Sequence, residues 1–80
     1  MQVEFFGVPR ERAGVSRLDV EAVTLGQLLE ALAVRVPALG TDRLHPSFIA
    51  SLNGDRFISD PATPLGENDS VLILSADAGG

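Results

Sequence analysis

The sequence contains no cysteine among its 80 residues, so neither a disulfide nor a thiolate metal site can stabilise the fold. A chain of this length forms one small domain, which buries only ~60% of the surface that its unfolded chain exposes. Hydrophobic residues make up 45% of the sequence, which is enough for a real core. Packing of that core must therefore hold the domain together.

Lysine is absent as well, and all six basic residues are arginines. Codon bias in a GC-rich genome is the simplest explanation, which the frequent alanine, leucine and glycine also suggest. The chemical consequence is that no side-chain amine of this chain can attack an activated carboxyl group of the same chain.

Positive charge and aromatic side chains are scarce: the net charge is −5, and the four phenylalanines have no tryptophan or tyrosine beside them. Surplus negative charge repels phosphate backbones and anionic lipids, which argues against nucleic acid and membranes as partners. No apolar run approaches the ~20 residues that span a bilayer, and Met1 is not followed by the pattern of a signal peptide. We therefore expect a soluble cytoplasmic protein.

The first third of the chain predicts two strands and the start of a helix. Residues 2–6 and 15–21 have strand composition, and GVPRERAG between them, residues 7–14, is predicted to be a loop. Thr24 and Gln27 stand three positions apart, as in a capping box, so we expect a helix to begin there.

An apolar stripe with helical spacing follows Thr24, and Pro37 ends the pattern. The stripe consists of Leu25, Leu28, Leu29, Leu32, Ala33 and Val36. Leu28, Leu29 and Leu32 are expected to form the centre of the core.

The second half predicts three further strands. FIASL at residues 48–52 runs into Asn53-Gly54, a pair typical of a type I′ hairpin turn, and RFI returns. Residues 60–68 are rich in turn formers, and SVLIL at residues 70–74 forms the last strand. Two hairpins that flank one amphipathic helix can bury it only as a mixed sheet that wraps one side of the helix. The sequence thus predicts an α+β fold of the β-grasp type.

One helix leaves one face of such a sheet uncovered. Alternation along the last strand places Val71 and Ile73 on the helix side. Phe6, Leu72 and Leu74 then face solvent, unless the alternation is reversed or the loop after the first strand covers them. A contiguous exposed apolar patch marks an interaction site, so these three side chains are predicted to contact a partner.

The side chains show no combination typical of an active site. His45, the only histidine, precedes a proline in a loop without a serine or cysteine dyad, so a structural or solvated role is expected. The acidic loop residues match no calcium-binding spacing and are best explained as solvated surface. These residues are Asp55, Asp60, Glu67, Asp69 and Asp77. GVPRERAG lacks the glycine spacing of a phosphate-binding loop, and we expect no bound metal or cofactor.

The group with unusual potential is the C-terminal carboxylate of Gly80. Residues 76–80 reach at most ~17 Å when extended. Gly79 and Gly80 lack a β-carbon, so they can enter a channel too narrow for any other residue. A carboxylate reacts only after activation, which indicates a partner enzyme that forms an acyl-adenylate. We expect residues 1–75 to form the domain and residues 76–80 a flexible tail.

Over its whole length the chain resembles the ubiquitin-like sulfur carriers of the MoaD/ThiS family, especially the small subunits of molybdopterin synthase. The resemblance lies in VEFFGVPRERAG, VTLGQLLEAL, FIASLNGD, LGENDSVLIL and the terminal GG, in this order. It implies a β-grasp fold and an activating enzyme, like those that act on ubiquitin, which uses ATP to adenylate Gly80. Sulfur from a donor protein then converts Gly80 to a thiocarboxylate. In the molybdopterin branch, the tail enters the large subunit of the synthase and delivers sulfur to a pterin precursor.

By this resemblance, Gly79 and Gly80 carry the chemistry. The residues expected to contact partners are Phe6, Leu72, Leu74, Ala76, Asp77 and Ala78. The carrier itself would hold no ATP, because the activating enzyme uses it.

Three alternatives remain open. Molybdopterin-type tails often have prolines before the final glycines, whereas residues 75–78 read SADA, so a carrier for another sulfur pathway such as thiamine fits as well. Thiamine-type carriers typically lack the long RERAG-like segment, which favours the molybdopterin branch. The second alternative is a protein modifier that forms isopeptide bonds, and the third is a β-grasp binding module whose glycine pair is inert.

Overall fold

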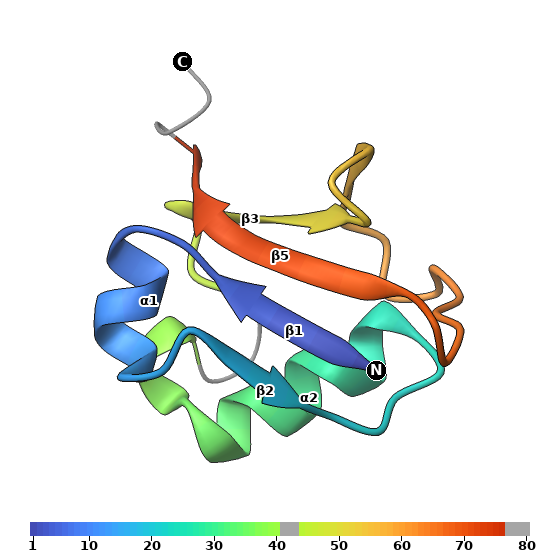
Figure 1. Cartoon of the computed structure of the whole chain (residues 1–80), viewed down its shortest axis with the longest axis horizontal. Coiled ribbons are helices and arrows are strands. Elements are labelled where there is room, and N and C mark those ends of the chain that lie inside the picture. The colour runs from blue at the N-terminus through green and yellow to red at the C-terminus, as the bar shows by residue number, and fades with distance from the viewer. Residues whose placement is uncertain (41–43, 77–80) are drawn as a thin grey trace.

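The computed structural model describes residues 1–40 and 44–76. Strands in these residues form a five-stranded sheet with the order β2-β1-β5-β3-β4 (Figure 1). The strands are β1 (Gln2–Phe5), β2 (Arg17–Asp19), β3 (Phe48–Leu52), β4 (Arg56–Ile58) and β5 (Ser70–Ser75). The helices are α1 (Val8–Ala13), α2 (Leu25–Arg35) and the short 3-10 helix η1 (Pro37–Leu39).

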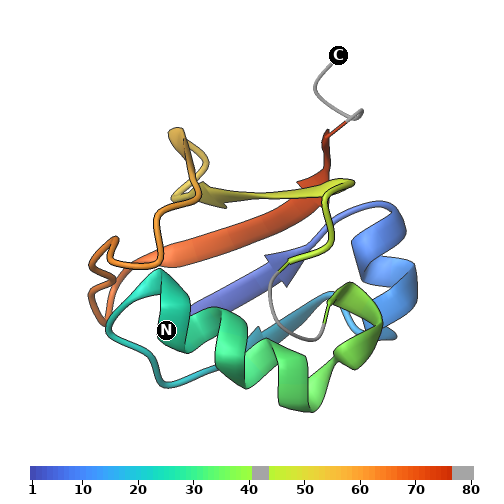
Figure 2. The same ribbon diagram turned by 180° about the vertical axis from the view of Figure 1, so that it is seen from behind.

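The sheet is mixed. β1 and β5 are parallel neighbours in its middle, whereas β2 pairs with β1, and β3 with β4 and β5, in antiparallel orientation. Figure 2 shows α2 lying across one face of this sheet. The predicted α+β fold of the β-grasp type is confirmed.

The start of α2 follows the predicted capping pattern. Thr24 Oγ1 accepts a hydrogen bond from the amide of Gln27 at 3.2 Å, and Gln27 Oε1 accepts one from the amide of Val23 at 3.0 Å. The glutamine side chain thus reaches one residue further back than the simplest capping box predicts. The amide of Gly26 donates to the carbonyl of Pro61 at 2.9 Å, so the loop before β5 satisfies another free N–H of the first turn.

The core lies between α2 and the inner face of the sheet. Leu28 is completely buried, as are Val71 and Ile73 on the inner face of β5, so the predicted alternation of β5 is confirmed. Leu25 is also buried, but Leu29, which we predicted to be central, is only half-buried. Leu29 borders the open cavity between α2 and strands β3 and β4, so part of its side chain remains accessible.

The prediction of a loop over residues 7–14 is wrong, because this segment contains α1. Pro9 lies in the first helical turn, and Gly14 ends the helix in the left-handed conformation, with a φ of 76°. The amide of Gly14 donates to the carbonyl of Arg10 at 3.0 Å. Proline and glycine therefore start and stop a helix here rather than forming a simple loop. β2 is also shorter than the predicted strand over residues 15–21.

The predicted turn between β3 and β4 is confirmed. Asn53 and Gly54 have φ values of 55° and 72°, as a type I′ turn requires. Asn53 Nδ2 donates to Asp69 Oδ1 at 3.0 Å, and Asn53 Oδ1 accepts from the amide of Ser70 at 2.8 Å. The hydrogen bonds from Asn53 and from the amide of Gly66 lower the pKa of Asp69. This network joins the hairpin turn to the start of β5.

Two further properties concern only residues 1–40 and 44–76. No helix in them is both long and apolar enough to cross a bilayer. Their histidine and carboxylate side chains form no group of three or more that could hold a metal ion.

Candidate partner-binding face and C-terminal arm

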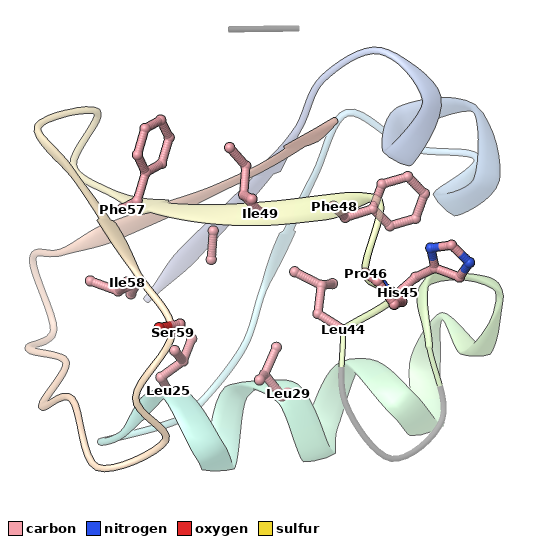
Figure 3. A pocket seen from close by; sticks show the side chains of 11 residues that line it. Leu25, Leu29, Leu44, His45, Pro46, Phe48, Ile49, Phe57, Ile58 and Ser59 are labelled. Atoms are coloured by element: carbon pink, nitrogen blue, oxygen red, sulfur yellow. The ribbon is translucent and has the colours of Figure 1, made fainter. Parts of the chain in front are cut away.

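The face of the sheet opposite α2 carries a row of apolar side chains. The strand register places Leu74 beside Ile49, and Leu72 beside Ser51, which in turn pairs with Phe57. Figure 3 shows that Ile49 and Phe57 point away from α2. This face is therefore not limited to residues of β5.

Phe6 continues this face beyond the end of β1. Its amide donates to the carbonyl of Ile73 at 3.0 Å, which places Phe6 next to Leu74. We call the resulting surface the outer patch, and it consists of Phe6, Ile49, Phe57, Leu72 and Leu74.

The side chains of the outer patch differ in exposure. Phe6 is 47% exposed and Phe57 68%, whereas Leu72 and Leu74 are half-buried. The predicted outward direction of all three residues, Phe6, Leu72 and Leu74, is confirmed, although the two leucines are partly covered by their neighbours. The two phenylalanines lie on opposite sides of the patch, with β5 and β3 between them, and exposed aromatic side chains of this kind suit a protein interface.

Sequence reasoning missed Ile49 and Phe57. A two-residue turn at Asn53-Gly54 would pair Leu52 with Asp55 and place Phe57 opposite the buried Ala50. The structure instead pairs Leu52 with Arg56, and this shift of one residue places Phe57 opposite Ser51, on the face that carries Leu72. The turn signal therefore did not specify the face of Phe57.

Charged side chains border the outer patch near Phe6. A shallow depression of about 200 Å³ is lined there by Glu4, Arg10 and Arg17 together with Phe6. Both arginines are exposed, although the chain as a whole is acidic. A partner with an apolar centre and carboxylates at one side would complement this edge.

The C-terminal arm begins at Ala76, which is exposed. The amide of Ala76 donates to the carbonyl of Ser47 at 2.8 Å. The remaining predicted site residues, Asp77, Ala78, Gly79 and Gly80, lie outside the described residues. From Ala76 onward, four residues follow, which span at most ~14 Å.

A cavity of about 320 Å³ opens between α2 and the edge of the sheet formed by β3 and β4. Figure 3 shows Leu25, Leu29 and Leu44 on its helix side and Ile58 at one end. The residues lining it include no carboxylate, and His45 is their only titratable member. The cavity therefore offers packing space and no acid–base pair.

Three of the loop side chains considered as candidate catalytic or ligand residues, His45, Asp60 and Asp69, accept hydrogen bonds within loops and turns. His45 Nδ1 accepts a hydrogen bond from the amide of Ser47 at 3.0 Å. Asp60 Oδ1 accepts one from the amide of Ala62 at 2.9 Å. Asp69 accepts hydrogen bonds from Asn53 Nδ2 and from the amide of Gly66. These groups stabilise turns, in agreement with the structural role expected for His45.

Comparison with known proteins gives a family and a set of similar structures. The model described as the ThiS family matches residues 3–80, nearly the whole chain. No curated protein matches the sequence closely enough to count as a relative.

Several solved structures have the same fold. The solution structure of small archaeal modifier protein 1 from Methanosarcina acetivorans is 26% identical, with a TM-score of 0.79; the match covers 99% of this chain and 94% of that one. Subunits 1 and 2 of molybdopterin-converting factor from Helicobacter pylori form a complex whose matching chain is 25% identical, with a TM-score of 0.69 and coverage of 99% and 96%. The BexX/CysO complex from Amycolatopsis orientalis contains a chain that is 18% identical, with a TM-score of 0.74 and coverage of 99% and 98%. At that identity, the third comparison shows the fold alone.

Proposed function

Because the chain belongs to the ThiS family, whose members include ubiquitin-like sulfur carriers and modifiers, we propose that it carries sulfur as a thiocarboxylate on Gly80. The observation that supports this most strongly is the extent of the family match, which includes the terminal glycine pair. We further propose that the chain serves as the small subunit of a molybdopterin synthase.

The proposed cycle has three steps. The carboxylate of Gly80 attacks the α-phosphorus of ATP in the activating enzyme, which forms an acyl-adenylate and releases pyrophosphate. A persulfide on a donor protein then attacks the acyl carbon and displaces AMP, which gives an acyl disulfide; a thiol attacks the donor's sulfur in that disulfide, forms a disulfide with the donor and releases the thiocarboxylate. In the third step the thiocarboxylate sulfur bonds to an acceptor, and water cleaves the resulting thioester, so the sulfur stays on the acceptor and the carboxylate is regenerated. The activating enzyme holds the ATP, and the carrier contributes its terminus and its docking surface.

The outer patch is the proposed docking surface for these enzymes. It lies on the face of the sheet that α2 leaves uncovered, and the strand that supplies Leu72 and Leu74 also leads into the arm. A partner that covers the patch would therefore hold the domain while the terminus enters its active site.

Substitution of Phe6 by aspartate should weaken binding to the activating enzyme or to the large synthase subunit by about tenfold or more, because a charge replaces an exposed aromatic anchor. Isothermal titration calorimetry measures the loss. The matched control is Val34→Asp, which puts the same charge on an 82% exposed valine of α2 and should bind normally. Unfolding of Phe6→Asp, seen by circular dichroism, would instead place Phe6 in the core.

The molybdopterin assignment is supported by the similarity to the Helicobacter pylori converting-factor complex and by the segment that forms α1. The similarity to the Methanosarcina modifier at 26% identity favours a second candidate, attachment of Gly80 to lysines of other proteins. Both candidates use the same activated terminus. The carrier cannot form chains through its own lysines, because it has none.

The proposal is tested by intact mass spectrometry of the purified chain before and after incubation with an activating enzyme, ATP and a sulfur donor. We expect the mass to rise by the difference between one sulfur and one oxygen atom. Addition of the large synthase subunit and the pterin precursor should reverse this rise. Conjugates of higher mass on other proteins would favour the modifier, and an unchanged mass with a competent enzyme would contradict both.

A further inference from the structure

A short turn at residues 45–48 holds the base of the C-terminal arm. The amide of Phe48 donates to the carbonyl of His45 at 2.9 Å, with Pro46 at the position that prolines favour in such turns. The amide of Ser47 donates to His45 Nδ1 at 3.0 Å. The carbonyl of Ser47 accepts from the amide of Ala76 at 2.8 Å. Both polar groups of the Ser47 backbone are thus engaged, one with the histidine and one with the arm.

The imidazole of His45 is itself held in place by packing. Its ring centroid lies 5.4 Å from that of Phe48, at an interplanar angle of 45°. The guanidinium carbon of Arg12 in α1 lies 5.1 Å from the centroid of the Phe48 ring, and Arg12 Nη1 donates to the carbonyl of Ala38 at 3.3 Å. Figure 3 shows the rings of His45 and Phe48 side by side at one end of the cavity.

From these contacts we infer that His45 is a positioning residue for sulfur loading. Its Nδ1 orients Ser47, and the carbonyl of Ser47 fixes the amide of Ala76, the last described residue before the terminal glycines. The inference rests on the proposed function, because it concerns how Gly80 is presented to the activating enzyme.

The expected effect of this arrangement is on binding rather than on chemistry. With the Ala76 amide fixed, four residues remain between the domain and the terminus, whereas release of Ala76 adds a fifth. The enzyme must then order that extra residue when Gly80 enters its active site. Ordering one residue of backbone corresponds to a factor of ~5 to 30 in an equilibrium constant.

The fold provides a closely matched control turn. This turn comprises residues 60–63. The carbonyl of Asp60 accepts a hydrogen bond from the amide of Thr63 at 2.9 Å, and Asp60 Oδ1 accepts one from the amide of Ala62 at 2.9 Å. Pro61 occupies the same position in this turn as Pro46 does in the other. The two turns therefore use the same pair of bonds. They lie toward opposite ends of β5 in Figure 1, and only the His45 turn bonds to Ala76.

The experiment compares His45→Ala, His45→Asn and Asp60→Ala with the unchanged protein. Amide hydrogen exchange at Ala76 is followed by NMR, and kcat and KM for pyrophosphate release are measured with the adenylating enzyme encoded in the same genome. His45→Ala should lose protection at Ala76 and raise KM for the carrier about fivefold or more, with kcat unchanged. His45→Asn should restore the protection at Ala76 and the KM, because the side-chain oxygen of an asparagine can accept a hydrogen bond from the amide of the residue two positions later. Asp60→Ala should change neither.

Three results would overturn the inference. They are retained protection at Ala76 in His45→Ala, failure of His45→Asn to restore KM, and an equal rise of KM in Asp60→Ala. Failure of the proposed function has a different signature, which the unchanged protein shows: it would release no pyrophosphate with this enzyme, or it would release pyrophosphate without gaining the mass of a thiocarboxylate when a sulfur donor is present.

Discussion

Deletion of Gly80, or addition of one serine after it, should abolish sulfur loading completely. The proposed chemistry takes place on the terminal carboxylate. Deletion of Gly80 moves that carboxylate back to Gly79, and the added serine places it on a residue that has a side chain. Loading is measured with a thiol-directed alkylating reagent after incubation with the activating enzyme, ATP and a sulfur donor. One label should appear on the C-terminal peptide of the unchanged protein and none on either variant.

The composition makes this measurement unusually clean. Because the chain has no cysteine, any alkylation must report sulfur that was gained during the incubation. Because it has no lysine, its own side chains cannot consume the activated carboxyl group. Label that persists with the terminus blocked, or that never appears with a competent enzyme set, would favour a binding module with an inert glycine pair.

Gly79→Val provides an intermediate case in the same assay. It keeps the terminal carboxylate but adds a β-branched side chain next to it, which should impair entry into a channel of glycine width. Reduced labelling of this variant, with normal stability, would show that loading depends on passage of the tail through a narrow channel as well as on the terminal carboxylate.

Leu28→Ala should cost ~2 to 5 kcal/mol in the free energy of unfolding, a large share of what a small domain has. Leu28 is completely buried between α2 and the sheet, so truncation leaves a cavity that its neighbours cannot fill. Urea denaturation followed by circular dichroism measures the loss at equilibrium.

Leu29→Ala is the matched control for this measurement. The same atoms are removed from the next residue of α2, but Leu29 is half-buried and already borders the open cavity. Its loss should therefore be clearly smaller than that of Leu28→Ala. Equal losses for the two variants would contradict the orientation of α2.

Where local patterns specify structure, the sequence predicted it well. The Thr24 and Gln27 pair located the start of α2, and Asn53-Gly54 located the turn between β3 and β4. The alternation in β5 correctly separated its buried residues from those of the outer patch. Segment 7–14 was misassigned because proline and glycine mark both loops and the ends of short helices, and the pattern alone does not distinguish them.

The sequence by itself determined the order of α2 and the strands, the composition of the helix stripe and the glycine pair at residues 79–80. These properties depend on residues close together in the chain, whose spacing can be read directly. Only the tertiary structure decided that Ile49 and Phe57 join Phe6 in one patch, and that Ser47 bonds to Ala76. Such contacts join residues far apart in sequence, and they arise only when the strands pair in one register around α2.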